Sequence, residues 1–321
     1  MHAIVLHAFG PAENLSFETW PDPVPGRDQV RIAVRAAGVH FIETVKRAGI
    51  RTELAPPPPE LPSIFGGEVA GTVESVGPGV DAVWVGERVV VSESRPGGYA
   101  ELAVASASAL HRIPDGVGFE AAVATVVTGT TALQFLDVAR LSPEDTVLIT
   151  SAAGGVGQLL VRHAVGLGAT VIGAAGGPAK GEIVRALGAD QVLDYNEPGW
   201  ERAIGGRMVT VVLDGVGGEK AEAAFSMIAD GGRYLTIGSS SQQEYEPDAE
   251  LAERRGITTR DVLLELLDRA EEGPAFEARA LAAVAEGMLV PAVHAFPLDR
   301  AADAHRALED RATSGKVVLV R

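Results

Sequence analysis

The chain has 321 residues, of which 46% are hydrophobic and 22% charged, a size and composition that allow two globular domains with separate cores. Its 43 acidic and 27 basic residues give a net charge of -16, which argues against nucleic acid or an anionic membrane as a partner, because both are polyanions. The absence of cysteine excludes disulfides, thiolate zinc sites and a cysteine nucleophile.

Residues 1 to about 120 have the pattern of a β-rich domain. Short runs with alternating apolar residues, each closed by a glycine or proline turn, predict strands. The predicted strands are Ala3 to His7, Gln29 to Ala37, Glu68 to Val76, Arg88 to Glu93 and Tyr99 to Val104. A short helix is expected from His40 to Ala48, and the prolines between Ala55 and Pro62 predict an extended surface loop. Many short strands joined by glycine turns indicate a small barrel or sandwich.

From Glu120 the pattern changes to helices alternating with strands. One helix is expected from Glu120 towards Leu136. The strands predicted after it are Thr146 to Thr150, Ala169 to Ala174, Gln191 to Tyr195, Met208 to Leu213 and Arg233 to Ile237, with helices between most of them. This alternation predicts a doubly wound parallel sheet with helices on both faces, whose ligands bind at the carboxyl ends of the strands. Asp214, at one such end, is expected to hold the backbone amides of the next turn.

The remaining residues predict a polar loop or edge, three helices and one strand. Ser240 to Arg255 is the loop, and helices are expected at Asp261 to Glu272, Phe276 to Glu286 and Arg300 to Glu309. The strand Lys316 to Val320 is assigned to the first domain, because the second sheet is already complete without it.

A glycine-rich turn joins the strand Thr146 to Thr150 to the helix that follows. Its residues, Ala152-Ala153-Gly154-Gly155-Val156-Gly157, match the dinucleotide-binding fingerprint in the form A-x-G-x-x-G. Backbone N–H groups at a helix N-terminus can hold a pyrophosphate without a charged side chain, provided that no Cβ blocks the approach. The alternative is a turn that only lets the helix pack closely on the sheet.

Several further motifs follow one another in order along nearly the whole chain. They include Val34-Arg35-Ala36-Ala37-Gly38-Val39-His40, Gly67-Glu68-Val69-Ala70-Gly71, Gly97-Gly98-Tyr99-Ala100-Glu101, Leu187-Gly188-Ala189-Asp190 and Gly315-Lys316-Val317-Val318. This series resembles the medium-chain dehydrogenase/reductase superfamily, and within it the zinc-free, zeta-crystallin-like quinone oxidoreductases. The resemblance implies an α/β protein with a GroES-like β-rich catalytic domain (1–120 and 275–321), a Rossmann NADPH-binding domain (121–274) and an active site between them.

The resemblance also allows the zinc question to be examined residue by residue. Zinc-dependent relatives place a cysteine where His40 stands and a histidine where Gly67 stands, and they add a lobe of four cysteines. A catalytic zinc needs three protein ligands. His40 and Glu68 alone do not supply them, so we expect no metal.

The choice of cofactor depends on the end of the second strand of the parallel sheet. An NAD enzyme presents Asp or Glu there, about 20 residues past the glycine turn, to bind the ribose 2′-hydroxyl. This chain has Ala174-Ala175-Gly176-Gly177. Lys180 and Tyr195 fall where the resembling family contacts the 2′-phosphate and the adenosine end, which favours NADPH; the alternative for Lys180 is an exposed lysine without a ligand. The expected cofactor-binding residues are Thr131, Ala152, Gly154, Gly155, Val156, Gly157, Lys180, Tyr195 and Gly238.

The candidate catalytic residue is His40, at a position where the family usually has asparagine. It could donate a hydrogen bond or a proton to the reduced oxygen. It could equally orient the nicotinamide or cap the following helix. Thr128 and Tyr99 are candidates for lining the substrate site, with core or turn packing as the alternative.

The expected activity is zinc-free transfer of hydride from NADPH to a quinone. The alternatives are a 2-enone or enoyl-thioester reductase and a non-catalytic NADPH-binding structural or sensor protein. The sequence shows no cleavable leader and no uninterrupted membrane span, so we expect a cytoplasmic protein. The family implies a homodimer paired through edge strands, but Thr258 to Glu265 runs into a helical pattern where relatives often show that strand.

Overall fold

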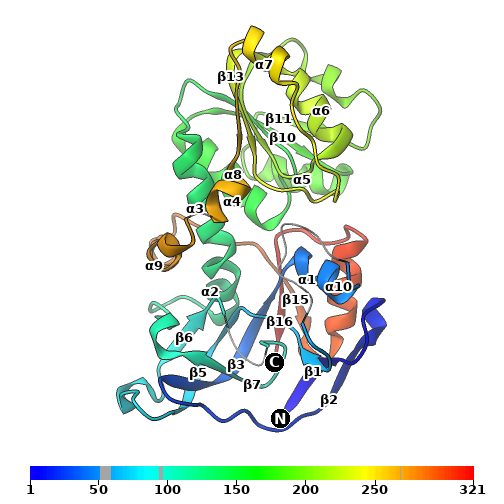
Figure 1. Cartoon of the computed structure of the whole chain (residues 1–321). Coiled ribbons are helices and arrows are strands. Elements are labelled where there is room, and N and C mark those ends of the chain that lie inside the picture. Colours follow the sequence, from blue (N-terminus) through cyan, green and yellow to red (C-terminus); the bar gives the residue numbers. More distant parts are fainter. Residues whose placement is uncertain (51–58, 94–96, 268) are drawn as a thin grey trace. The chain divides into compact units, whose positions relative to one another are not determined.

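The computed structural model describes residues 1–50, 59–93, 97–267 and 269–321 (Figure 1). The chain divides into two compact units, a first unit of Met1–Thr130 with Pro274–Arg321 and a second unit of Thr131–Gly273. The expected division after residue 120 lies earlier than this one. The segment between contains helix α2 (Phe119–Val126), which packs against strands of the first unit. Residues 55–58 of the proline loop expected between Ala55 and Pro62 lie outside the described residues.

The first unit is built on two sheets whose strand pairs are antiparallel except for one parallel pair in the larger sheet. Its larger sheet has the strand order β15-β16-β3-β5-β6-β8, with β7 also paired to β3, and its smaller sheet has the order β2-β1-β4. The strands are β1 (His2–Leu6), β2 (Leu15–Thr19), β3 (Gln29–Val39), β4 (Ser63–Ile64), β5 (Val69–Val76), β6 (Arg88–Val91), β7 (Leu102–Ser106), β8 (His111–Arg112), β15 (Val293–Pro297) and β16 (Lys316–Val320). In β3 the buried Val30, Ile32 and Val34 alternate with less buried residues, as expected for a strand with one face in the core.

Helices cover parts of these sheets and join them. Those of the first unit are α1 (Phe41–Arg47), α2, α10 (Ala301–Glu309) and most of α9 (Gly273–Ala285). Strand β16 runs parallel to β15 and antiparallel to β3, which confirms that the final strand belongs to this unit. Strand β15 was not predicted from the sequence.

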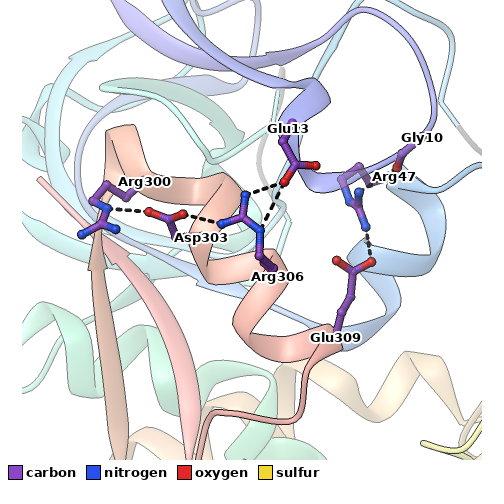
Figure 2. Close-up of polar contacts among 7 residues, drawn as sticks. All are labelled: Gly10, Glu13, Arg47, Arg300, Asp303, Arg306 and Glu309. Atoms are coloured by element: carbon purple, nitrogen blue, oxygen red, sulfur yellow. Dashed lines mark hydrogen bonds and ion pairs between the residues drawn. The ribbon is translucent and has the colours of Figure 1, made fainter.

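Helix α10 is tied to the opening part of the chain by ion pairs, as Figure 2 shows. Arg47 of α1 donates to the carbonyl oxygen of Gly10 at 2.7 Å and pairs with Glu309 at the end of α10. Arg306 of α10 pairs with Glu13 at 2.5 Å. Exposed pairs such as the second contribute little to stability, because solvent and salt screen them. Arg47, however, is only 1% exposed, so removal of its partner would leave a buried charge.

The second unit is built on a six-stranded parallel sheet with the order β11-β10-β9-β12-β13-β14. The strands are β9 (Thr146–Ile149), β10 (Thr170–Ala175), β11 (Gln191–Asp194), β12 (Val209–Asp214), β13 (Ile228–Thr236) and β14 (Thr258–Asp261). The helices are α3 (Thr128–Ala139, of which the first residues belong to the first unit), α4 (Gly155–Leu167), α5 (Pro178–Ala186), α6 (Gly218–Ser226), α7 (Ala249–Arg254) and α8 (Val262–Leu267). The predicted doubly wound parallel sheet is confirmed.

Besides the domain division, three sequence expectations differ from the structure. The single helix expected from Glu120 is two helices, α2 and α3, bent by 41° at Val127, whose amide donates to Glu68 Oε1 at 3.2 Å. Thr258–Asp261, expected to be helical towards its end, is strand β14, which pairs in parallel with β13. Helix α8 therefore begins at Val262, one residue after the expected start at Asp261. The polar stretch from Ser240 to Arg255 contains α7, whose first turn is capped by the Asp248 carboxylate.

Within the described part of the chain, no single helix has both the length and the apolar character of a membrane span. The bent pair α2 and α3 meets those two criteria only when both helices are taken together.

Candidate functional site

The glycine turn of the second unit lies between β9 and α4. Helix α4 begins at Gly155, and its N-cap residue Gly154 makes no side-chain capping bond, so no capping side chain occupies the first-turn amides. Ala152 is buried in the turn and donates its N–H to the carbonyl of Ala174 at 3.0 Å. A Cβ at Gly157 would lie 2.3 Å from the Ser151 carbonyl oxygen, so the helix packs against the turn only because this residue is glycine. Such a helix N-terminus suits a pyrophosphate.

The neighbouring strand ends are fastened by Asp214. Its carboxylate accepts hydrogen bonds from Thr150 Oγ1 at 2.6 Å and from the amides of Val216 and Gly217 at 3.2 and 3.1 Å, which confirms its expected role in holding the turn. Burial raises the pKa of Asp214, and these hydrogen bonds oppose the rise. Gly238 lies just after β13. An ideal Cβ built on Gly238 would lie 3.5 Å from the carbonyl oxygen of Gly215, which is an ordinary contact. Thr131 is half-buried in α3.

The end of β10 carries the residues expected at the adenosine side of a cofactor. Gly177, with φ +86°, is the N-cap of α5 and donates its N–H to Asp194 Oδ1 at 2.9 Å. Lys180 lies in the first turn of α5 and is half-buried. An ideal Cβ at Gly176 would lie 3.1 Å from Tyr195 Cε2, so the end of β10 and the residue after β11 lie side by side. The chain offers here a lysine and an aromatic ring, and no carboxylate at the end of β10 itself.

A buried ionic cluster surrounds His40 in the first unit. Glu68 Oε2 accepts from His40 Nε2 at 2.8 Å and from Lys316 Nζ at 2.8 Å. Lys316 Nζ also lies 3.2 Å from His40 Nδ1 and 2.9 Å from Nε2, so the ammonium sits beside both ring nitrogens. The side chains of Glu68 and Lys316 are 1% and 5% exposed, whereas that of His40 is 27% exposed. Burial alone would raise the pKa of Glu68, but the charges and hydrogen bonds of Lys316 and His40 lower it to about 2.

This cluster depends on a glycine in β3. A Cβ at Gly38 would lie 1.9 Å from Glu68 Oε2 and 3.1 Å from Lys316 Cε, so the carboxylate occupies the space that a side chain would need. Among the side chains that the structure describes, no three of His, Asp and Glu come together as metal ligands. The ammonium of Lys316 instead provides the cation that balances Glu68.

Tyr99, a candidate for lining the substrate site, lies in the core of the first unit. Its side chain is 0% exposed, and its hydroxyl donates to Glu43 Oε2 at 2.7 Å and lies 3.2 Å from His305 Nε2. Burial and the Glu43 carboxylate raise the pKa of Tyr99. Its hydroxyl joins α1 to α10, which favours the core-packing alternative for Tyr99 over a place in the lining of the substrate site. Thr128 is also buried, at 6% exposure.

The same network makes a prediction for the pH dependence of stability. His305 is 0% exposed, its Nε2 faces Tyr99, and burial followed by the charge of Arg47 lowers its pKa to about 3. Between pH 6.5 and about 3 the unfolded chain therefore binds a proton that the folded chain does not, so stability falls as the pH falls. The slope from this residue is about 1.4 kcal/mol per pH unit.

We expect His305→Gln to flatten the stability profile over this range. Urea unfolding at several pH values between 4 and 7 measures the slopes, with His7→Gln, an exposed histidine of the same unit, as the matched control. Equal slopes for His305→Gln and the wild type would contradict the assignment.

Comparison with known proteins identifies the family. Residues 26–115 match the family described as Alcohol dehydrogenase GroES-like domain, and residues 187–319 match the one described as Zinc-binding dehydrogenase. A quinone oxidoreductase of Pseudomonas aeruginosa is 32% identical over 99% of this chain and 98% of its own length. The chain belongs to the medium-chain dehydrogenase/reductase superfamily. The resemblance inferred from its motifs is confirmed, and so is the combination of a GroES-like antiparallel sheet with a Rossmann-like parallel sheet.

Two further relatives of this medium-chain dehydrogenase/reductase bear on its substrate and its cofactor. A 2-haloacrylate reductase of a Burkholderia species is 32% identical over 99% of this chain and 98% of its own length. The solved structure of a mycobacterial protein complexed with NADPH has a TM-score of 0.87 and 36% identity, and each chain is covered completely.

Sequence reasoning missed two lysines that contact candidate site residues of this medium-chain dehydrogenase/reductase. Lys316 was seen only as part of a family motif. Its Nζ lies 2.9 Å from His40 Nε2, although the two residues are 276 positions apart in the sequence. Lys220, whose Nζ lies 4.2 Å from the centroid of the Tyr195 ring, was not singled out. The signal that could have found both is compositional: Lys46, Lys180, Lys220 and Lys316 are the four lysines in the whole chain, which otherwise uses arginine.

Proposed function

We propose that this medium-chain dehydrogenase/reductase is an NADPH-dependent oxidoreductase whose hydride acceptor is a quinone. The observation that carries the cofactor assignment is the end of β10, where Gly176 and Gly177 replace a ribose-binding carboxylate and Lys180 and Tyr195 lie close by. The NADPH-bound mycobacterial relative supports the same assignment.

The residues of the second unit would hold the cofactor by its phosphates. The first-turn amides of α4, at Gly155, Val156 and Gly157, would hold the pyrophosphate, and Lys180 with Tyr195 would hold the adenosine end. When bound, NADPH supplies the hydride. The protein's contribution is then to orient the reacting groups, to exclude water and to stabilise charge on the acceptor oxygen.

His40 is the group that we assign to the acceptor oxygen. A quinone that gains a hydride carries negative charge on oxygen and needs one proton to become the hydroquinone. An imidazole is suited to provide it. Glu68 and Lys316 hold the ring from its buried side, so the partly exposed remainder of His40 is presented in a fixed orientation. His40, whose side chain is 27% exposed, then takes the replacement proton from solvent.

A second candidate reaction is reduction of a conjugated carbonyl compound. The 2-haloacrylate reductase relative favours it, because a haloacrylate is an unsaturated acid rather than a quinone. Hydride would add to the β-carbon, and the resulting enolate would take the proton. Both reactions need the same donor and the same proton, so they differ only in the acceptor.

The test is anaerobic stopped-flow absorbance of NADPH, with a simple benzoquinone and a simple enone supplied separately. We expect oxidation with the quinone, and a decrease in the hydride-transfer rate of about 100-fold for His40→Ala, within the range of general acid catalysis. His7→Ala, which removes an exposed histidine of the same unit, is the matched control and should react as the wild type does. Binding of NADPH without oxidation by either acceptor would favour the non-catalytic binding protein instead.

A further inference from the structure

The two lysines of the second unit lie at the same edge of its sheet. Lys180 is in the first turn of α5, which follows β10, and Lys220 is in the first turn of α6, which follows β12. Only four of the 27 basic residues of the chain are lysines, and two of these four lie at this one edge. Lys180 was expected at the cofactor; Lys220 was not.

Lys220 is joined to the adenosine side by two contacts. Its Nζ lies 4.2 Å from the centroid of the Tyr195 ring, and it donates to Asn196 Oδ1 at 3.2 Å. A cation over an aromatic face at this distance is attracted to it by the negative charge of the ring face. The ammonium of Lys220 is therefore held over the residue that we assign to the adenosine end.

The contact with Asn196 also fixes the direction of that amide. Oδ1 accepts from Lys220, and an ideal Cβ at Gly176 would lie 3.0 Å from Nδ2 and 3.4 Å from Oδ1, so the amide lies beside the end of β10 with its N–H₂ group uncommitted to Lys220. The backbone amide of Asn196 is held by Asp194 Oδ1 at 3.0 Å, the same atom that accepts from Gly177. One short surface thus gathers an ammonium, an amide N–H₂ group and an aromatic ring at the ends of β10 and β11.

We propose that Lys220 is a specificity-determining residue that, together with Lys180, binds the 2′-phosphate of NADPH. This inference rests on the proposed function. A 2′-phosphate distinguishes NADPH from NADH by a dianionic group, which is bound by cations and N–H donors. In a protein of net charge -16, a second local cation also offsets the general repulsion of an anionic cofactor. Tyr195 holds the ammonium in place before the cofactor arrives.

The test is a titration of NADPH and NADH into the wild type, Lys220→Gln, Lys180→Gln and the control Lys46→Gln, followed by calorimetry. We expect Lys220→Gln to raise the Kd for NADPH about tenfold and to leave the Kd for NADH unchanged. The dependence of the NADPH Kd on salt should also weaken, because one charged contact is lost. Lys46 belongs to the first unit and should affect neither cofactor.

Lysine acetylation followed by mass spectrometry gives a second readout that does not depend on a variant. We expect NADPH to protect Lys180 and Lys220 more than NADH does, with Lys46 as the internal reference. A wild type that prefers NADPH, loses that preference in Lys180→Gln and keeps it in Lys220→Gln would overturn the role of Lys220 while leaving the proposed function intact. A wild type that binds both cofactors equally would overturn both proposals. An equal loss of NADPH and NADH binding in Lys220→Gln would overturn only the specificity role of Lys220.

Discussion

Lys316→Met is expected to lower the free energy of unfolding by about 3–5 kcal/mol at neutral pH, the cost of leaving one partner of a buried ion pair unbalanced. Glu68 is 1% exposed and receives its strongest favourable charge from Lys316. Methionine fills much of the space of the lysine stem, so the loss reflects charge more than volume. Chemical denaturation of the two proteins measures the difference.

The effect of Lys316→Met should depend on pH in a defined direction. In the wild type the pKa of Glu68 is lowered from 4.5 to about 2, so its ionised form contributes stability above pH 4.5 that is lost as the pH falls towards 2. Without Lys316 the pKa of Glu68 rises. As the pH falls, the buried carboxylate of the variant is therefore protonated at a higher pH than that of the wild type, which removes the unbalanced charge. The difference between the two proteins should therefore be largest above pH 4.5 and narrow below it.

The double variant Glu68→Gln/Lys316→Met separates this explanation from simple damage to packing. With both charges removed, most of the lost stability should return, as it does when a buried pair is replaced by neutral groups. A double variant as unstable as Lys316→Met would show that the loss came from packing in β16 rather than from an unpaired charge.

Gly157→Ala is the second change with a large expected effect. Its Cβ would lie 2.3 Å from the Ser151 carbonyl oxygen and 2.9 Å from the Ala152 Cα, and backbone atoms cannot move away as a flexible side chain can. We expect α4 to shift from the turn, with a loss of about 1–3 kcal/mol of stability and at least a tenfold loss of NADPH affinity. Thermal unfolding and cofactor titration measure the two effects.

Gly166→Ala provides the matched control, because it changes the same residue type in the same helix. Its Cβ would meet nothing within 4 Å. This substitution should stabilise α4 by about 0.5–1 kcal/mol through reduced backbone entropy of the unfolded chain, and leave NADPH binding unchanged. Equal behaviour of the two variants would contradict the close packing of Gly157.

The parts of the fold that could be predicted are those fixed by neighbours in the sequence. Apolar runs, glycine turns and helical spacing over residues 146–175 are local signals, and the structure has a strand, a turn, a helix and a strand there. The bend at Val127 is different, because its amide bonds to Glu68, which is 59 positions away. Strand β14 has four exposed residues, so its only signal is the pairing with β13.

The candidate site was predictable to the extent that motifs mark it. The glycine turn, Lys180 and Tyr195 stand at family positions and lie at the ends of parallel strands, as their spacing required. Glu68 was considered only as a metal ligand, because nothing local brings Lys316 beside it. The choice between lining and core packing stayed open for Tyr99 for the same reason: its partner His305 lies 206 positions away, and only the fold brings them together.

The position of β16 also bears on the order in which the units can form as the polypeptide leaves the ribosome. Strand β16 lies between β15 and β3 in the larger sheet of the first unit, although β3 is made almost three hundred positions earlier. The second unit is one continuous stretch, and its parallel sheet is complete once β14 has emerged. The nascent chain can therefore finish the second unit while β3 still waits for its neighbour, so the unit that is synthesised first is the one that is completed last.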